Sequence, residues 1–346
     1  MNIRYFIDVD EEGHPMFDGV RIQDDGLTRV ILEGAHRRKA GDPRTPLVTE
    51  CDGETCILNA FSDPWVAQLC VFKSSDTLEW TFPGGFQREV TLSQVAVDKW
   101  NRCHAYLGPN EVPSVLSRKA QAMFLEDLHT RGLDVSFKPK PWRRINENRV
   151  EIPQFWEETY RDGKDGWEMG GPNPVLVSRE AAVRGLVPPP ARLLVPGPGR
   201  GHDAVFLEKM GYNVTAVDFS EEALTGFRKN YPASKLDYKS EDIFETLAGS
   251  VGKWDAVFEH TLFVALDPAL RERYVEAVAK ALKPGGTFFG IFLVRTNPGG
   301  PAFGLTQWEL RELVKDRFDI RAWEVARDSE PKRLGIELWA ALRLKP

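Results

Sequence analysis

The stretch Arg192-Leu-Leu-Val-Pro-Gly-Pro-Gly-Arg-Gly-His-Asp203 decides the fold of the C-terminal part of the chain. It starts as a short apolar strand and continues into a loop with three glycines, Gly197, Gly199 and Gly201, before a helical pattern begins. Glycine lets the backbone turn tightly and approach a ligand without a Cβ atom in the way. The stretch therefore predicts a strand, a turn that binds a ligand, and a helix.

Strand and helix patterns alternate after this loop. Further strands are expected at Asn213–Val217, Trp254–Phe258 and Thr287–Val294, and helices at His202–Met210, Glu221–Asn230 and Pro268–Leu282. Such alternation gives a mostly parallel sheet with helices on both faces, and ligands bind beyond the carboxyl ends of its strands. We therefore expect an α/β fold, a doubly wound Rossmann-like sheet, over residues 146–346.

An acidic residue, Asp218, ends the second expected strand, about 20 residues after the glycine loop. A carboxylate at this distance accepts hydrogen bonds from the ribose hydroxyls of a nucleoside held over the loop. The simpler alternative is a tight turn followed by a helix start, which Ser220, Glu221 and Glu222 also resemble.

The loop itself indicates which nucleoside is bound. Its spacing is Gly-x-Gly-x-Gly, and Asp203 falls in the first turn of the following helix, where it would oppose a pyrophosphate but suit a cation. This favours S-adenosylmethionine, whose sulfonium and amino groups are positive. After the region of the third strand, Asp242 is placed to read an adenine edge, with Ile243 and Phe244 beside the ring.

With these motifs in place, residues 152–346 resemble class I S-adenosylmethionine-dependent methyltransferases, and among them the thiopurine methyltransferase superfamily, which includes plant halide and thiol methyltransferases. The resembling segments are Phe155–Trp167, Val195–Asp203, Asp218, Glu259–Pro268, Arg271 with Tyr274, Lys283–Gly286 and Asn297–Phe303. The resemblance implies methyl transfer to sulfur, selenium or halide nucleophiles. The cofactor-binding residues expected are Trp156, Trp167, Gly197, Gly199, Asp218, Phe219, Asp242, Ile243 and Glu259. For the two tryptophans the alternative is a place in the core.

Three residues are candidates for contact with the methyl acceptor. A thiol is partly ionised at neutral pH and a halide wholly so, so no strong base is obligatory. Glu259 and His260 are nevertheless acid/base candidates, although a single histidine after a strand is as often structural. Arg271 is expected to hold an anionic acceptor, the alternative being a surface ion pair on its own helix.

Residues 1–145 are expected to form an additional N-terminal α+β domain. Strands are expected at Asn2–Val9, Thr28–Leu32 and Thr55–Leu58, a helix at Ser117–Leu128, and an extended connector at Lys138–Arg144. The domain carries no sequence motif that indicates a catalytic or ligand-binding function. Its candidate roles are homodimerisation, covering the acceptor, or binding a protein partner.

Composition excludes several other functions. The formal net charge of −6 argues against a nucleic-acid partner. No run of about 18 apolar residues predicts a membrane span, and the acidic N-terminus does not read as a signal peptide, so a cytoplasmic location is expected. The four cysteines form no Cys-x-x-Cys pair, and no metal site is expected.

Two rival functions stay open at this point, beside transfer to a small nucleophile. One is an O- or N-methyltransferase whose larger acceptor is recruited by the N-terminal domain; such acceptors have a high pKa and need a base. The other is a cofactor-binding scaffold without turnover, because one fold hosts many functions.

Overall fold

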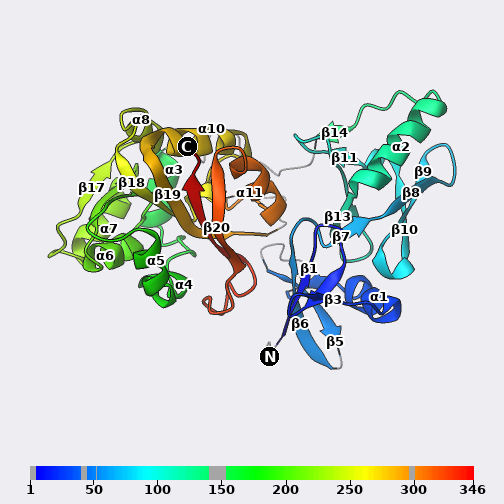
Figure 1. Ribbon diagram of the computed structural model, residues 1–346, viewed down its shortest axis with the longest axis horizontal. Helices are drawn as coiled ribbons and strands as arrows, with labels where there is room; N and C mark the ends of the chain where they lie inside the picture. Colours follow the sequence, from blue (N-terminus) through cyan, green and yellow to red (C-terminus); the bar gives the residue numbers. More distant parts are fainter. Residues whose placement is uncertain (1–4, 40–44, 52, 140–152, 296–300) are drawn as a thin grey trace. The chain divides into compact units, whose positions relative to one another are not determined.

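The computed structural model describes residues 5–39, 45–51, 53–139, 153–295 and 301–346 (Figure 1). The chain divides into two compact units. The first contains Met1–Trp142, Arg295–Pro298 and Thr306–Glu309, and the second contains Arg143–Val294, Gly299–Leu305 and Leu310–Pro346. The sequence places the domain boundary at residue 145 and does not anticipate that two short C-terminal segments join the first unit.

A seven-stranded sheet forms the centre of the second unit, with the strand order β17-β16-β15-β18-β19-β21-β20. Its strands are β15 (Arg192–Pro196), β16 (Asn213–Asp218), β17 (Asp237–Ser240), β18 (Trp254–His260), β19 (Leu282–Leu293), β20 (Phe318–Val325) and β21 (Glu337–Leu344). The first five strands run parallel, β21 pairs antiparallel with β19, and β20 pairs antiparallel with β21 at the edge of the sheet. The expected Rossmann-like sheet is confirmed.

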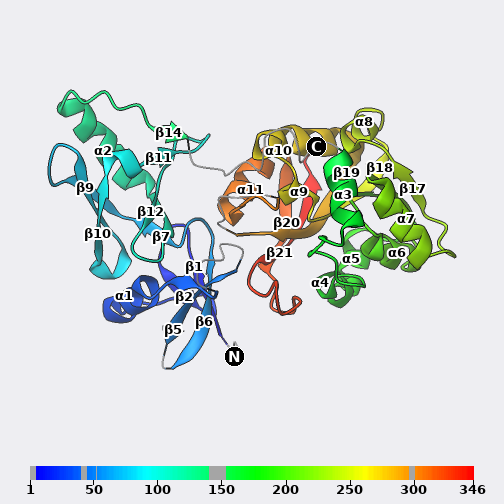
Figure 2. The same cartoon turned by 180° about the vertical axis from the view of Figure 1, so that it is seen from behind.

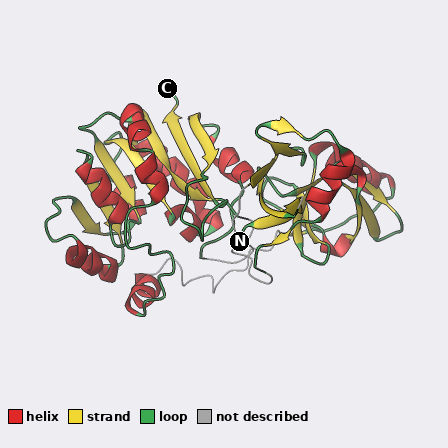
Figure 3. Ribbon diagram, turned by 90° about the horizontal axis from the view of Figure 1, so that it is seen from below, coloured by secondary structure: helices red, strands yellow, loops and turns green. Residues whose placement is uncertain are grey.

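Helices lie on both faces of this sheet (Figure 3). The helices from residue 153 onward are α3 (Pro153–Arg161), α4 (Pro174–Ser178), α5 (Glu180–Leu186), α6 (His202–Lys209), α7 (Glu221–Asn230), α8 (Ile243–Ala248), α9 (Leu262–Ala265), η3 (Pro268–Leu270), α10 (Arg271–Ala281) and α11 (Gln307–Val314). Alternate strand residues face opposite sides. Leu193 and Val195 therefore pack with Ala204 of α6 on one face. Tyr274 of α10 meets Phe288 on the other, with ring centroids 6.4 Å apart.

Three sheets and two helices make up most of the first unit. The sheet orders are β3-β2-β1-β6-β5-β4, β10-β9-β8 and β14-β11-β12-β13-β7. The elements are β1 (Tyr5–Val9), β2 (Pro15–Phe17), β3 (Val20–Arg21), α1 (Asp25–Glu33), β4 (His36–Arg37), β5 (Leu47–Cys51), β6 (Glu54–Ala60), β7 (Trp65–Ala67), β8 (Leu69–Phe72), β9 (Thr77–Thr81), η1 (Pro83–Gly85), β10 (Gln87–Thr91), η2 (Leu92–Gln94), β11 (Ala96–Val97), β12 (Cys103–Leu107), β13 (Val112–Leu116), α2 (Arg118–Thr130) and β14 (Lys138–Pro139).

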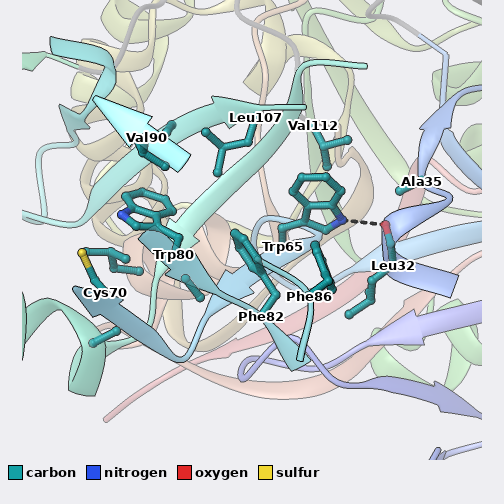
Figure 4. Close-up of a cluster of buried hydrophobic side chains, with 14 of the residues drawn as sticks. Leu32, Ala35, Trp65, Cys70, Trp80, Phe82, Phe86, Val90, Leu107 and Val112 are labelled. Atoms are coloured by element: carbon teal, nitrogen blue, oxygen red, sulfur yellow. Dashed lines mark hydrogen bonds between the residues drawn. The ribbon is translucent and has the colours of Figure 1, made fainter. Parts of the chain in front are cut away.

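Aromatic side chains fill the core of the first unit (Figure 4). The ring centroid of Trp65 lies 5.1 Å from that of Phe86 and 5.4 Å from that of Phe82. Its indole N–H donates to the Leu32 carbonyl at 2.7 Å, so the polar end of this buried side chain is satisfied. Trp80 is fully buried in the same cluster. These tryptophans therefore serve the core of this unit.

One expected strand is wrong. Thr28–Leu32 is β-branched and apolar, but it lies inside helix α1. The side chain of Asp24 caps this helix by accepting the Leu27 N–H, and Ile31 and Leu32 are buried on its inner face. The cap and the burial outweigh the strand preference of the β-branched residues. Residues 2–4 and 140–144 of other expected segments lie outside the described residues.

Among the described residues, no helix has the length and apolar character that crossing a membrane requires.

Candidate cofactor and acceptor site

A cavity of about 310 Å³ opens at the carboxyl ends of the parallel strands of the second unit. Its wall includes the ends of β15, β16, β18 and β19 and the segment that follows β17. This is where ligands bind in doubly wound sheets. The wall contains most of the expected cofactor residues, namely Trp156, Trp167, Gly197, Gly199, Asp218, Phe219, Asp242 and Ile243.

The glycine loop forms the floor of the cavity between β15 and α6. Gly197, Gly199 and Gly201 all have positive φ angles, of 57°, 54° and 81°. A Cβ atom on Gly199 would lie 2.7 Å from the hydroxyl oxygen of Tyr160, and one on Gly201 would lie 2.6 Å from the ring of Phe227. Backbone conformation and close approach both require glycine here.

The carboxylate of Asp218 lies at the end of β16, beside this loop. One of its oxygens accepts the Gly199 N–H and the other accepts the Ser220 N–H, each at 3.1 Å. Burial raises the pKa of Asp218 to about 6, against the effect of these hydrogen bonds. Ser220 caps α7, so a helix start and a cavity carboxylate occur together, and the two alternatives from the sequence do not exclude each other.

Three aromatic residues form one side of the cavity. The ring centroid of Trp167 lies 5.7 Å from the ring centroids of both Trp156 and Tyr160. Tyr160 is buried, and burial raises its pKa. The sequence analysis missed Tyr160, although it follows Trp156 by one helical turn and therefore shares its face of α3.

Asp242 and Ile243 form the side of the cavity next to β17. The Asp242 side chain caps α8 by accepting the Phe244 N–H at 2.8 Å. Ile243 is buried, and Phe244 lines the cavity beside it. This arrangement is an apolar wall with an exposed carboxylate at its edge.

His260, at the end of β18, lines the cavity but is held from both sides. Its Nδ1 lies 2.6 Å from an oxygen of Asp203. Its Nε2 lies 3.0 Å from a guanidinium nitrogen of Arg333 and 3.1 Å from the side-chain nitrogen of Asn173. An arginine only donates, so Nε2 must accept and the proton must sit on Nδ1, facing Asp203.

Arg333 is a second residue that the sequence analysis missed. It lies between β20 and β21, lines the cavity, and also donates to the Trp167 carbonyl at 2.6 Å and to the buried Glu337 carboxylate at 3.2 Å. No motif marks this loop, so nothing in the sequence points to it.

Glu259, expected as an acid/base and cofactor-binding residue, lies outside the cavity. Its side chain is fully buried and does not line the cavity described above. The carboxylate accepts the Phe263 N–H at 2.6 Å and the Tyr274 hydroxyl at 2.8 Å, and burial raises its pKa to about 7. In a β-strand, neighbouring side chains face opposite sides, so His260 reaches the cavity and Glu259 turns into the layer under α10.

The structure also corrects both expectations for Arg271. It is only 3% exposed, and its guanidinium donates to the carbonyls of Phe263, Phe303 and Gly304. It therefore ties α10 to the chain segment at 303–304 and neither lines the cavity nor lies on the surface. Arg273, two residues later, does line the cavity, with its guanidinium 4.3 Å from the ring of Phe244.

Comparison with known proteins identifies the family of the chain. The sequence pattern of the thiopurine S-methyltransferase family matches residues 152–340, more than half of the chain. The chain belongs to this family. In this thiopurine S-methyltransferase family member the matched region contains every residue of the cavity wall, and the resemblance noted in the sequence is confirmed.

Several relatives of this family member have assigned names. A probable thiol methyltransferase 2 of Arabidopsis thaliana is 29% identical over 164 residues, which are 46% of this chain and 70% of that protein. A thiopurine S-methyltransferase of Legionella pneumophila is 30% identical over 148 residues, 38% of this chain and 66% of that protein. Thiocyanate methyltransferase 1 of Arabidopsis thaliana is 29% identical over 188 residues, 53% of this chain and 81% of that protein.

The protein is thus an S-adenosylmethionine-dependent methyltransferase. The cavity fits this cofactor: the glycine loop brings bare backbone to its floor, and the carboxylates of Asp203 and Asp218 in its wall suit a ligand that carries positive charge and ribose hydroxyls. The aromatic faces of Trp156 and Trp167 suit a sulfonium.

Proposed function

We propose that this enzyme methylates a small nucleophile that is already anionic or soft when it reaches the cavity: a thiol, sulfide, halide or chalcogen oxyanion. The observation that carries this proposal is the state of His260. Its one lone pair, on Nε2, is engaged by Arg333 and Asn173, so the imidazole has no site at which to take a proton from an acceptor. A site of this kind suits nucleophiles that need no base.

The carboxylates nearest to His260 and the glycine loop support the same conclusion. Asp203 accepts the Asn173 N–H as well as the His260 proton. Asp218 accepts two backbone N–H groups, and Glu168 accepts the Gly170 N–H at 2.7 Å. Each of these carboxylates therefore contributes hydrogen bonds that hold the wall of the cavity, and each keeps further acceptor sites for a ligand.

The chain's own residues then provide binding, orientation and exclusion of water. When bound, S-adenosylmethionine supplies an activated methyl group on a positive sulfur. We infer that Asp218 holds its ribose, that Ile243 and Phe244 hold its adenine, and that Trp156 and Trp167 cover it. The remaining wall includes Ala265, Leu266, Leu293, Pro301 and Ala302, which are apolar and exclude water from the acceptor. In-line displacement needs this alignment more than it needs proton transfer.

The names of the relatives point to the same acceptor class. They are described as thiol, thiocyanate and thiopurine methyltransferases, and the acceptors in those names are sulfur compounds.

The pH dependence of the rate tests this proposal. We expect kcat/KM for a series of thiols to rise with the fraction of thiolate, so that each profile follows the pKa of the thiol itself. With iodide, which is ionised throughout, kcat/KM is expected to be flat between pH 7 and 9. A profile with the same enzyme-derived pKa for every acceptor would show that a protein base is required and would contradict the proposal.

A further inference from the structure

Helix α3 lies against helix α7 (Figures 1 and 2). One carboxylate oxygen of Glu157 accepts the backbone N–H of Glu221, and the other accepts that of Glu222 at 2.9 Å. The third N–H of the helix, from Ala223, is accepted by its own cap, Ser220. The first three N–H groups of α7 therefore all have acceptors, and a different helix supplies two of them.

The chemistry of this contact favours a carboxylate. The first N–H groups of a helix have no partner within the helix, and the helix dipole gives this end a partial positive charge. Hydrogen bonds from N–H groups to a carboxylate are shorter and stronger than those to a neutral acceptor. An ion pair between Arg161 and Glu222, at 3.2 Å, also joins the two helices, but both of its side chains are exposed.

The contact joins two elements that each contribute to the cofactor cavity, helix α3 and the segment that leads from Asp218 into α7. Glu157 is flanked on α3 by Trp156 and, one turn later, by Tyr160, and both side chains line the cavity. On the other side, α7 begins directly after the segment that carries Asp218. Tyr160 also lies so close to the glycine loop that a Cβ atom on Gly199 would collide with its hydroxyl oxygen.

We propose that Glu157 is a positioning residue for the cofactor: by capping α7 it holds α3 in place, so that Trp156 and Tyr160 close the cavity beside Asp218. Glu157 itself does not line the cavity. The alternative is that the cap stabilises α7 and has no effect on the cofactor. A positioning role predicts that loss of the cap weakens cofactor binding, whereas a purely structural role predicts lower stability with unchanged cofactor affinity.

A pair of substitutions on α7 separates these alternatives. Glu221→Pro removes the N–H that Glu157 accepts, at the first position of the helix, where proline is well tolerated. The preceding residue, Ser220, has φ −86° and ψ 117°, which is compatible with a following proline. Glu221→Ala removes the same side chain but keeps the N–H, and serves as the matched control.

The readout is the Kd of S-adenosylhomocysteine, measured by calorimetry on the full-length protein, together with the thermal midpoint of unfolding. We expect Glu221→Pro to raise this Kd about tenfold relative to Glu221→Ala, the effect of one lost charge-assisted hydrogen bond. The KM for S-adenosylmethionine is expected to rise in parallel, with kcat at saturation unchanged, because no group that touches the reacting atoms is altered. Any fall in the thermal midpoint of Glu221→Pro relative to that of Glu221→Ala measures what the lost hydrogen bond costs the free protein, separately from its effect on the Kd.

Variants on α3 provide a second, independent measurement. Glu157→Ala is expected to raise the Kd more than Glu221→Pro does, and Glu157→Gln is expected to restore part of the affinity because it keeps one acceptor oxygen. Glu158→Ala, an exposed neighbour on the same helix, is the control and should bind like the wild type. If Glu221→Pro and Glu157→Ala fold and bind S-adenosylhomocysteine as their controls, Glu221→Ala and Glu158→Ala, do, the proposal is wrong. The measurement needs no acceptor, so it fails or succeeds independently of the proposed function.

Discussion

The guanidinium of Arg333 donates to Nε2 of His260 across 3.0 Å. Because the guanidinium has no lone pair, the imidazole keeps its proton on Nδ1. This N–H donates a hydrogen bond to a carboxylate oxygen of Asp203, with 2.6 Å between the nitrogen and the oxygen. The histidine that appears from the sequence to be an acid/base candidate is therefore part of a polar network in the cavity wall. This contact is the basis of the proposal that the methyl transfer needs no protein base.

His260→Ala is the variant that tests this distinction. With a thiol as the acceptor, at a pH below the pKa of that thiol, we expect kcat/KM to fall by less than about tenfold, because only wall packing is lost, whereas loss of a general base typically costs about 10²–10⁴-fold. The measurement is the rate of S-adenosylhomocysteine formation at saturating cofactor, with iodide, which has no proton to lose, as the control acceptor. A drop of three orders of magnitude with the thiol but not with iodide would identify His260 as a general base and contradict the proposal.

Asp218→Ala should weaken cofactor binding by about 1.5–3 kcal/mol, the usual scale for a lost hydrogen bond to a charged group. Since the pKa of Asp218 is about 6, wild-type affinity should also decline as the pH falls through 6 and the carboxylate becomes protonated. Calorimetry with S-adenosylhomocysteine between pH 5 and 8 measures both effects. Asp237→Ala, an exposed aspartate on neighbouring β17, is the matched control, and equal affinities in the two variants would remove Asp218 from the site.

Gly199→Ala should abolish tight cofactor binding because its new Cβ meets the Tyr160 hydroxyl oxygen at 2.7 Å. Gly252→Ala is the control for backbone strain: its φ is 60°, close to the 54° of Gly199, and a Cβ there meets nothing within 4 Å. Adding Tyr160→Phe to Gly199→Ala should recover part of the affinity, because the ring carbon next to the hydroxyl lies 3.7 Å away. An unrescued double variant would mean that the backbone conformation, rather than Tyr160, excludes alanine.

Glu259→Gln tests a buried carboxyl rather than the cavity. Burial raises the pKa of Glu259 from 4.5 to about 7 in the folded protein, so the unfolded chain ionises first as the pH rises. The stability that the wild type gains from this group is full below pH 4.5 and is lost by about pH 7, a change on the order of 3 kcal/mol. The thermal midpoint of the wild type should therefore fall relative to that of Glu259→Gln over this range. A constant difference between the two midpoints would contradict the raised pKa.

The sequence predicts the second unit well because its signals are local and strong. The buried parallel strands are apolar runs, and the spacing between the glycine loop and Asp218 is typical of a doubly wound sheet that binds a nucleoside. Helix α7 follows the expected range without any shift, because Ser220 and Asn230 mark its ends.

Predictions that depend on side-chain direction fail. Strand alternation turns the side chain of Glu259 away from the cavity into the layer under α10. Arg271 begins α10 itself, and its buried guanidinium donates to backbone carbonyls instead of reaching the cavity. Arg333 comes from a loop more than 70 residues after His260, and contacts at that distance leave no local pattern. In the first unit, Thr28–Leu32 has the composition of a strand, and only the cap at Asp24 argues for a helix.

Turnover by the purified full-length protein tests the central claim most directly. S-adenosylhomocysteine formation should be measured with sulfide, thiocyanate, iodide, aromatic thiols, selenite and tellurite, with detection of the methylated products. We expect turnover with at least one of these nucleophiles, and methylation at the sulfur, halide or chalcogen atom. Absence of turnover with all of them, while S-adenosylmethionine still binds, would contradict the claim and point to a larger acceptor or to a scaffold without activity.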